Sequence, residues 1–169
     1  MNSNEVVITS AKRTAVGSLG KSLKNVQSFE LGASVIKELL LKSKINNEEI
    51  DEVILGQVLT AGLGQNPARQ AAIKSGIPKE KTAYIVNQVC GSGIRSVASA
   101  VQSICSGDSK IVIAGGQENM SLSPHAIFMR DGKKLGDVEM IDTMIKDGLW
   151  DAFHGYHMGV TAENVAEKF

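Results

Sequence analysis

Four short apolar runs constrain the fold of this chain more than any other feature. They are rich in β-branched residues, nearly continuous rather than alternating, and bounded by polar residues or glycine: 6–8, 53–55, 84–86 and 111–114. Short continuous runs of this kind are typical of strands that are buried on both faces, as in a parallel sheet. We therefore expect four strands in a mostly parallel sheet.

Segments with helical periodicity separate these runs. Apolar residues repeat at helical spacing over 29–40, and Ser28 is a candidate N-cap for that helix. Pro67 suits the first turn of a second helix over 68–74. A third helix is expected directly after Cys90. The order βαβαβαβ predicts an α/β fold with right-handed crossovers.

The third predicted helix carries no charged residue from Ser96 to Gly107. One of its faces is an apolar stripe, and the others hold small residues. A crossover helix on the surface would turn lysine and glutamate outward, whereas a helix without a charged face is normally buried on all sides. We therefore expect another domain or another subunit to cover this helix.

The chain changes character after 116. Residues 117–160 are rich in methionine, glycine, aspartate and histidine, and they contain no clear strand pattern. Connections of this length are usually functional. A helical pattern returns over 160–169, so the sequence predicts a layered region followed by a long loop region that ends in a helix.

Charge and composition argue against several classes of function. Lys+Arg and Asp+Glu are equal at 18 each, which gives no basic footprint for nucleic acid and no polybasic signal for a membrane surface. We see no signal peptide and no apolar run of about 18 residues that could cross a membrane. Two cysteines are too few for a disulfide framework, so a reduced, cytoplasmic setting is expected.

Cys90 is the candidate nucleophile. It follows the predicted strand 84–86 and precedes the charge-free helix, at the strand end where open α/β sheets bind ligands. Gly91 and Gly93 permit a sharp turn and a close approach by a ligand. The layout is analogous to a nucleophile elbow with sulfur in place of oxygen. A helix N-terminus favours a thiolate, and its N–H groups can face a developing oxyanion.

A helix terminus alone does not activate a thiol fully, because it contributes only about 0.3–1 kcal/mol. Activation normally needs a base, usually histidine. No histidine in the sequence has an obvious relation to Cys90, so we expect this partner to lie outside the chain. The second cysteine, Cys105, falls at the end of the charge-free helix and is interpreted as structural.

Several segments resemble the thiolase family. The most specific is 86–97, Val-Asn-Gln-Val-Cys-Gly-Ser-Gly-Ile-Arg-Ser-Val, which is similar to the family signature around its acylated cysteine. Four further segments support the resemblance: 8–17, 64–72, 114–121 and 156–164. Together they extend over the whole chain.

The resemblance implies a thiolase-like fold. Residues 1–118 would be an incomplete N-terminal core half that lacks the last strand of its domain, and residues 119–169 would begin a loop domain. It also implies a homo-oligomer, a dimer of dimers in the complete form.

By the same resemblance the activity is that of an acetyl-CoA C-acetyltransferase. Cys90 would take an acetyl group from one acetyl-CoA, and a second acetyl-CoA would attack it to give acetoacetyl-CoA and CoA, reversibly. The Cys90 N–H would contribute to an oxyanion hole, and Leu149, His157 and Met158 would line the pantetheine and acyl pocket. Coenzyme A thioesters are the substrates, and no cofactor or metal is expected.

The sequence departs from the family pattern in what it lacks. The Gly-His-Pro histidine, the Asn-Glu-Ala motif and the second catalytic cysteine in a Cys-x-Gly-Gly segment do not occur. We therefore expect the 169-residue chain to be inactive and poorly soluble alone. Two alternatives stay open: a degradative 3-ketoacyl-CoA thiolase for longer acyl chains, and a truncated, non-catalytic remnant that binds CoA or pairs with a full-length subunit. Segment 156–159 favours the short-chain type.

Two weaker signals have ordinary explanations. Asp151, His154 and His157 suggest a metal site, but the neighbouring glycines make a rigid helical face doubtful, and no metal is predicted. The charged block 130–134 is interpreted as a solvated loop. Subunit contact and steering of the coenzyme A phosphates are its two alternatives.

Overall fold

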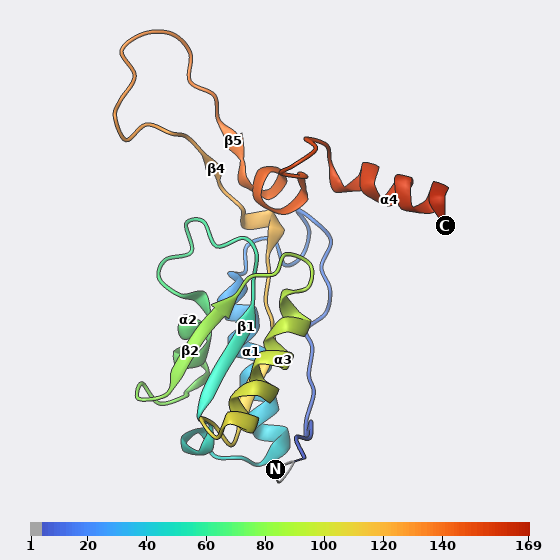
Figure 1. Ribbon diagram of the computed structural model, residues 1–169. Helices are drawn as coiled ribbons and strands as arrows, with labels where there is room; N and C mark the ends of the chain where they lie inside the picture. The colour runs from blue at the N-terminus through green and yellow to red at the C-terminus, as the bar shows by residue number, and fades with distance from the viewer. Residues whose placement is uncertain (1–4) are drawn as a thin grey trace.

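A three-stranded parallel sheet forms the centre of the molecule. The computed structural model describes residues 5–169. Strands β1 (Glu52–Gly56), β2 (Thr82–Val86) and β3 (Val112–Gly116) lie in the order β2-β1-β3 (Figure 1). Both pairings are parallel and in register from Glu52 to Gly56. The predicted α/β fold with a parallel sheet is confirmed.

Three helices cover the two faces of this sheet. Helix α3 (Ser92–Ser106) lies in front of the sheet in Figure 1, and α1 (Ser28–Ser43) lies behind it. Helix α2 (Pro67–Ser75) packs against α1 and against β1 and β2. All three helices were predicted from the sequence, and Pro67 stands in the first turn of α2 as expected.

The N-cap of α1 differs from the prediction. The helix begins at Ser28, and Gln27 is its cap, with the Gln27 backbone N–H donating to the Glu30 carboxylate at 3.3 Å. The Ser28 side chain is buried instead, and its oxygen accepts a hydrogen bond from Gln57 Nε2 at 2.9 Å. A tertiary partner therefore takes the hydroxyl that the sequence pattern assigned to capping.

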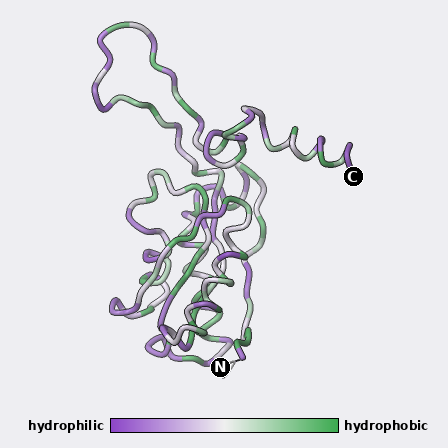
Figure 2. Tube along the Cα trace, viewed as in Figure 1, coloured by the Kyte–Doolittle hydropathy of each residue, from purple (hydrophilic) through white to green (hydrophobic). Residues whose placement is uncertain are grey.

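The hydrophobic core lies between the sheet and the pair α1–α2. Strand β1 contributes Val53 and Leu55, and α2 contributes alanines that let α1 pack closely. The buried cluster consists of Ile36, Leu40, Ile50, Val53, Leu55, Ala68, Ala71, Ala72, Ile77 and Ile113. Figure 2 shows hydrophobic residues along most of β1, as expected for a strand that is buried on both faces.

The first predicted strand does not form. Residues 6–8 make no backbone hydrogen bond within residues 5–169, and the Ile8 side chain is 80% exposed. This segment and β3 both line an apolar cavity of about 740 Å³, together with α1 and α3. The prediction was wrong because a strand needs a partner for its ladder of hydrogen bonds, and no described backbone pairs with this segment.

The region after β3 is less regular. It contains two 3-10 or π-helical turns, a short antiparallel hairpin and a last helix: η2 (Met120–Leu122), β4 (His125–Ala126), β5 (Ile141–Asp142), η3 (Met144–Leu149) and α4 (Met158–Lys168). The terminal helix was predicted, whereas the hairpin was not. The loop between β4 and β5 protrudes from the body (Figure 1). That 119–169 begins a separate loop domain stays a prediction. None of the helices in residues 5–169 has the length and apolar character that a membrane span requires.

Candidate active site

Cys90 lies at the carboxyl end of the sheet, in a turn between β2 and α3. Its side chain is exposed, and α3 begins two residues later with Gly91 as the N-cap. The turn is closed by hydrogen bonds from the Gly91 N–H to the Gln88 carbonyl (3.0 Å) and from the Ser92 N–H to the Val89 carbonyl (3.1 Å). The predicted order of strand, sharp turn and helix around the cysteine is confirmed.

The N-terminus of α3 sits directly on the ends of β1 and β3. A Cβ added at Gly56 would lie 2.4 Å from the backbone carbonyl carbon of Ser92, so only glycine permits this approach. The buried Ser96 hydroxyl lies 2.6 Å from the Gly93 carbonyl oxygen and 2.7 Å from that of Gly115. These contacts fix the first turn of the helix, and with it the turn that carries Cys90.

No hydrogen bond from the backbone N–H of Cys90 to another group is found within residues 5–169. Its side chain is also accessible. An exposed thiol beside an uncommitted N–H donor is an arrangement that can attack a carbonyl carbon and stabilise the oxyanion that develops on its oxygen.

Glu118, which follows β3, was missed by the sequence analysis. Its carboxylate accepts hydrogen bonds from the backbone N–H groups of Val58 (2.8 Å) and Leu59 (3.3 Å), just beyond β1. Burial raises the pKa of Glu118, and the two backbone hydrogen bonds oppose that rise. The only signal in the sequence is a single acid two residues after an apolar strand that ends in two glycines.

Leu149, His157 and Met158 lie near one another at the junction of η3 and α4. An antiparallel bridge pairs Trp150 with His157, and this places Leu149 beside Met158 along the two segments. All three predicted pocket residues are half-buried. The η3 turn packs over the end of β1, because a Cβ added at Gly148 would lie 3.5 Å from Leu59 Cδ2. The structure thus brings the three together, and no hydrogen bond joins them to Cys90.

The side chains of the three histidines lie beside partners other than Cys90. His157 Nδ1 accepts a hydrogen bond from the Gly159 N–H at 2.9 Å and caps α4, so Nε2 carries the proton of the neutral ring. His154 Nδ1 lies 3.2 Å from Asp151 Oδ2, and His125 Nε2 lies 3.9 Å from Asp142 Oδ2. In the described part of the chain, no histidine hydrogen-bonds Cys90.

The suspected metal ligands do not gather into one site. Asp151 accepts hydrogen bonds from the backbone N–H groups of His154 (2.9 Å) and Phe153 (2.8 Å), and these lower the pKa of its carboxyl, with the His154 side chain contributing less. Its partner His154 stacks on Tyr156, while His157 is used as a helix cap. Residues 5–169 hold no group of three side chains that could bind a metal ion.

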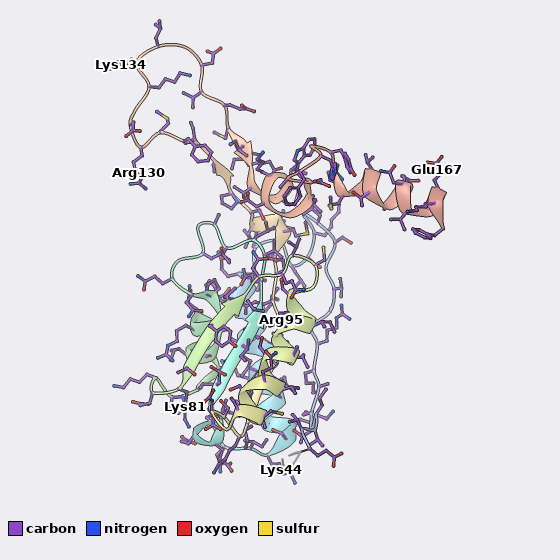
Figure 3. All side chains as sticks on the ribbon, in the orientation of Figure 1. Lys44, Lys81, Arg95, Arg130, Lys134 and Glu167 are labelled. Atoms are coloured by element: carbon purple, nitrogen blue, oxygen red, sulfur yellow. The ribbon has the colours of Figure 1, made fainter. Side chains whose placement is uncertain are left out.

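The charged block 130–134 lies on the protruding loop. Figure 3 shows Arg130 and Lys134 on this loop, far from Arg95 in the first turns of α3. The loop also carries exposed apolar side chains, including Phe128 and Leu135, and Figure 2 shows both kinds of residue along it. A solvated loop and a subunit contact both fit this position, and steering of the coenzyme A phosphates stays an untested alternative.

Helix α3 turns its small residues toward the sheet and its apolar stripe away from it. Ser92, Ser96 and Ala100 are buried, whereas the side chain of Ile94 is 80% exposed and Val101 is also exposed. From its sequence we expected this helix to be covered on all sides. Within residues 5–169 no segment covers the outer face.

A cysteine at a strand–helix turn, with a free N–H donor at its own backbone, defines a candidate thiol nucleophile for acyl transfer. The chain belongs to the thiolase family, because residues 6–169 match the family described as thiolase, N-terminal domain.

Its relatives include an acetyl-CoA acetyltransferase of Rhizobium meliloti, 59% identical over the whole of this chain and 43% of the relative. One of Shinella zoogloeoides is 56% identical over the same shares. A cytosolic acetyl-CoA acetyltransferase of Rattus norvegicus is 54% identical over 99% of this chain and 42% of the relative. The chain therefore spans less than half the length of these relatives.

Proposed function

We propose that this chain carries the acyl-accepting half of an acetyl-CoA C-acetyltransferase, with Cys90 as the nucleophile. The observation that carries the proposal is the exposed Cys90 thiol beside its own uncommitted backbone N–H, at the start of α3. The names of the relatives support acetyl transfer to and from coenzyme A as the chemistry.

In the first half-reaction the Cys90 thiolate attacks the carbonyl carbon of acetyl-CoA. The new C–S bond forms, the old one breaks, and CoA leaves as a thiolate that takes up a proton. The Cys90 N–H would donate to the carbonyl oxygen while it bears negative charge. In the second, the α-carbon of another acetyl-CoA loses a proton and attacks the acetyl-cysteine, which yields acetoacetyl-CoA and free Cys90. The reverse sequence is thiolysis, and no cofactor enters either direction.

The second half-reaction needs a base for the α-proton, and the first is slow without a base for the thiol. The described residues place no histidine at Cys90. We therefore expect the 169-residue chain to accept an acetyl group and not to turn over. This absence of a base is also what favours the alternative of a non-catalytic, CoA-binding chain.

Leu149, His157 and Met158 would contact the pantetheine arm and the acyl group. Their position favours this role, since η3 packs over the same end of the sheet from which Cys90 emerges. The exposed apolar residues of the β4–β5 loop fit a contact between subunits of a homo-oligomer. A cytoplasmic location follows by analogy with the relative named cytosolic. A longer-chain 3-ketoacyl-CoA substrate is less favoured, because the relatives cited are named for acetyl-CoA.

The test is covalent labelling with radiolabelled acetyl-CoA, followed by removal of free CoA thioesters. We expect label on the wild-type chain and on the matched control Cys105→Ser, and none on Cys90→Ser. Acetoacetyl-CoA should not form with the chain alone. Undiminished label on Cys90→Ser would place the nucleophile elsewhere, and an unlabelled wild-type chain would favour the non-catalytic alternative.

A further inference from the structure

Val89, the residue before Cys90, adopts a backbone conformation that its side chain disfavours. Its φ is 47°, in the left-handed region, and valine is β-branched. Holding such a residue there costs about 1–3 kcal/mol and requires surrounding structure that enforces it. Packing does not enforce it, because the Val89 side chain is 49% exposed. The cause must therefore lie in hydrogen bonds to its backbone.

Two side chains hydrogen-bond the backbone of Val89, one at its N–H and the other at its carbonyl. Asn87 Oδ1 accepts a hydrogen bond from the Val89 N–H at 2.9 Å. The Ser92 hydroxyl donates to the Val89 carbonyl at 2.6 Å and accepts from the Gln88 N–H at 2.9 Å. Ser92 is only 4% exposed, so its hydroxyl has no competing water. We call Asn87 and Ser92 the Val89 clamp.

The clamp is tied to the sheet behind it. Ser92 lies against Gly56 at the end of β1, where there is no room for a Cβ. Asn87 Nδ2 lies 3.5 Å from the Val58 carbonyl oxygen, a long contact, and the Val58 N–H donates to Glu118 at 2.8 Å. These contacts therefore fix the position of the turn before Cys90 relative to the ends of β1 and β3.

The left-handed conformation of Val89 decides where the following peptide groups point. If Val89 relaxed to an ordinary negative φ of about −63°, the Cys90 N–H would turn with the backbone. In the clamped turn this N–H is without an intramolecular acceptor in residues 5–169. It is therefore available to a carbonyl oxygen that is bound at the thiol.

We propose that Asn87 and Ser92 are positioning residues, which hold Val89 in the left-handed region so that the Cys90 N–H can donate to the thioester oxygen during acyl transfer. This inference rests on the proposed function, since it gives the clamp a role only if Cys90 accepts an acyl group. The hydrogen bonds of both side chains go to other residues of the turn and to Val58, not to Cys90.

The experiment compares two reactions of the same thiol. Iodoacetamide alkylates sulfur without forming an oxyanion, whereas acetyl transfer from acetyl-CoA passes through one. For each protein, the rate of acetylation is divided by the rate of alkylation, at Cys90 and at Cys105, by quantitative peptide mass spectrometry. The ratio cancels the intrinsic reactivity of the sulfur, which both reactions share, and Cys105, which is also exposed, is the internal reference.

We expect the Cys90 ratio of the wild-type chain to exceed the Cys105 ratio by at least about tenfold. Asn87→Ala and Ser92→Ala should lower it about tenfold, less than the loss of about 10²–10³ that follows complete removal of an oxyanion donor. Asn87→Ser, which keeps an oxygen that can bond the N–H two residues on, should retain most of it. Asn87→Gln keeps the amide but cannot make this short turn, and it should resemble Asn87→Ala.

Rescue separates positioning from a general loss of structure. Glycine adopts positive φ without strain, so Val89→Gly combined with Asn87→Ala should recover at least half of the lost ratio. The proposal is overturned if the wild-type ratio of acetylation to alkylation at Cys90 is high and Asn87→Ala, Asn87→Gln and Ser92→Ala all leave it unchanged. Equal ratios at Cys90 and Cys105 in the wild-type chain contradict the proposed function instead. Because Asn87 is exposed, its variants keep the test available if Ser92→Ala does not fold.

Discussion

The two faces of the central sheet are built from different kinds of side chain. On the face covered by α1 and α2, large aliphatic residues interlock, and Ile36 is only 1% exposed. On the α3 face the contacts are made by serine, alanine and glycine, and the large residue Ile94 turns outward. The first face is suited to stabilising the fold by burial of apolar area. The second face lacks this stabilisation by large aliphatic side chains. Its small residues instead let a helix N-terminus lie close to two strand ends, where Cys90 lies.

A second contrast runs along the strands. Asp51, before β1, accepts hydrogen bonds from the Lys110 N–H (2.7 Å) and the Ile111 N–H (3.0 Å), and these lower the pKa of its carboxyl. Glu118, at the opposite end of the sheet, also accepts two backbone N–H bonds, but burial raises its pKa. The two carboxylates make the same kind of bridge, and the difference lies in how far each is removed from water.

The largest expected effect separates the two faces directly. Ile36→Ala should destabilise the chain by about 2–5 kcal/mol, since it removes a fully buried side chain and leaves a cavity. Ile94→Ala should change the free energy of unfolding by less than about 0.5 kcal/mol, because that side chain is exposed. Urea denaturation monitored by circular dichroism at low protein concentration measures both.

The comparison would break if Ile94→Ala were as costly as Ile36→Ala. That outcome would show that the outer face of α3 is buried in solution, by self-association of the chain. Repeating the Ile94→Ala measurement over a range of protein concentrations distinguishes the two cases, since stabilisation by association depends on concentration.

A smaller effect, of at most about 1 kcal/mol for the more exposed Asp51, compares the pH dependence of the two carboxylates. The Asp51 pKa is lowered below 3.8 in the fold, so Asp51 stabilises above that value and its contribution is lost as the pH falls through the folded pKa. The advantage of the wild-type chain over Asp51→Asn should therefore shrink on acidification.

Glu118 should behave in the opposite sense. Its pKa is raised above 4.5 in the fold, so its contribution is fully present below 4.5 and is lost as the pH rises through the folded value. Relative to Glu118→Gln, the wild-type chain should lose stability as the pH rises above 4.5. Parallel pH slopes for the Asp51 and Glu118 pairs would contradict the assignment of burial to one of them only.

The parts of the fold that could be predicted from the sequence are those with strong local patterns. The runs 53–55, 84–86 and 111–114 correspond to β1, β2 and β3, although only β1 is buried nearly throughout, since Tyr84 in β2 is 38% exposed. Pro67 marked the start of α2, and the apolar helical pattern that follows Cys90 placed α3 directly after it. The position of Cys90 followed from these elements, since it only required the order of strand, turn and helix.

The features that could not be predicted depend on partners distant in sequence. Residues 6–8 have the composition of a strand, but a strand also needs a neighbouring backbone. Ser28 has the composition of a cap, but Gln57 takes its hydroxyl. The hydrogen bonds of Glu118 and the packing of Ser92 depend on the ends of three strands lying together. A local sequence pattern does not show which strand ends lie together. The roles of Cys90, Leu149, His157 and Met158 stay predictions.

The most direct test of the central claim, that the carboxyl end of the sheet holds the reactive thiol, is alkylation of the folded chain with a limiting amount of iodoacetamide. Both cysteines are exposed, so access alone does not decide between them, and only Cys90 lies in the turn before a helix N-terminus, where free N–H groups favour a developing negative charge. Peptide mapping by mass spectrometry should find the adduct mainly on Cys90. Preferential labelling of Cys105 would contradict the account.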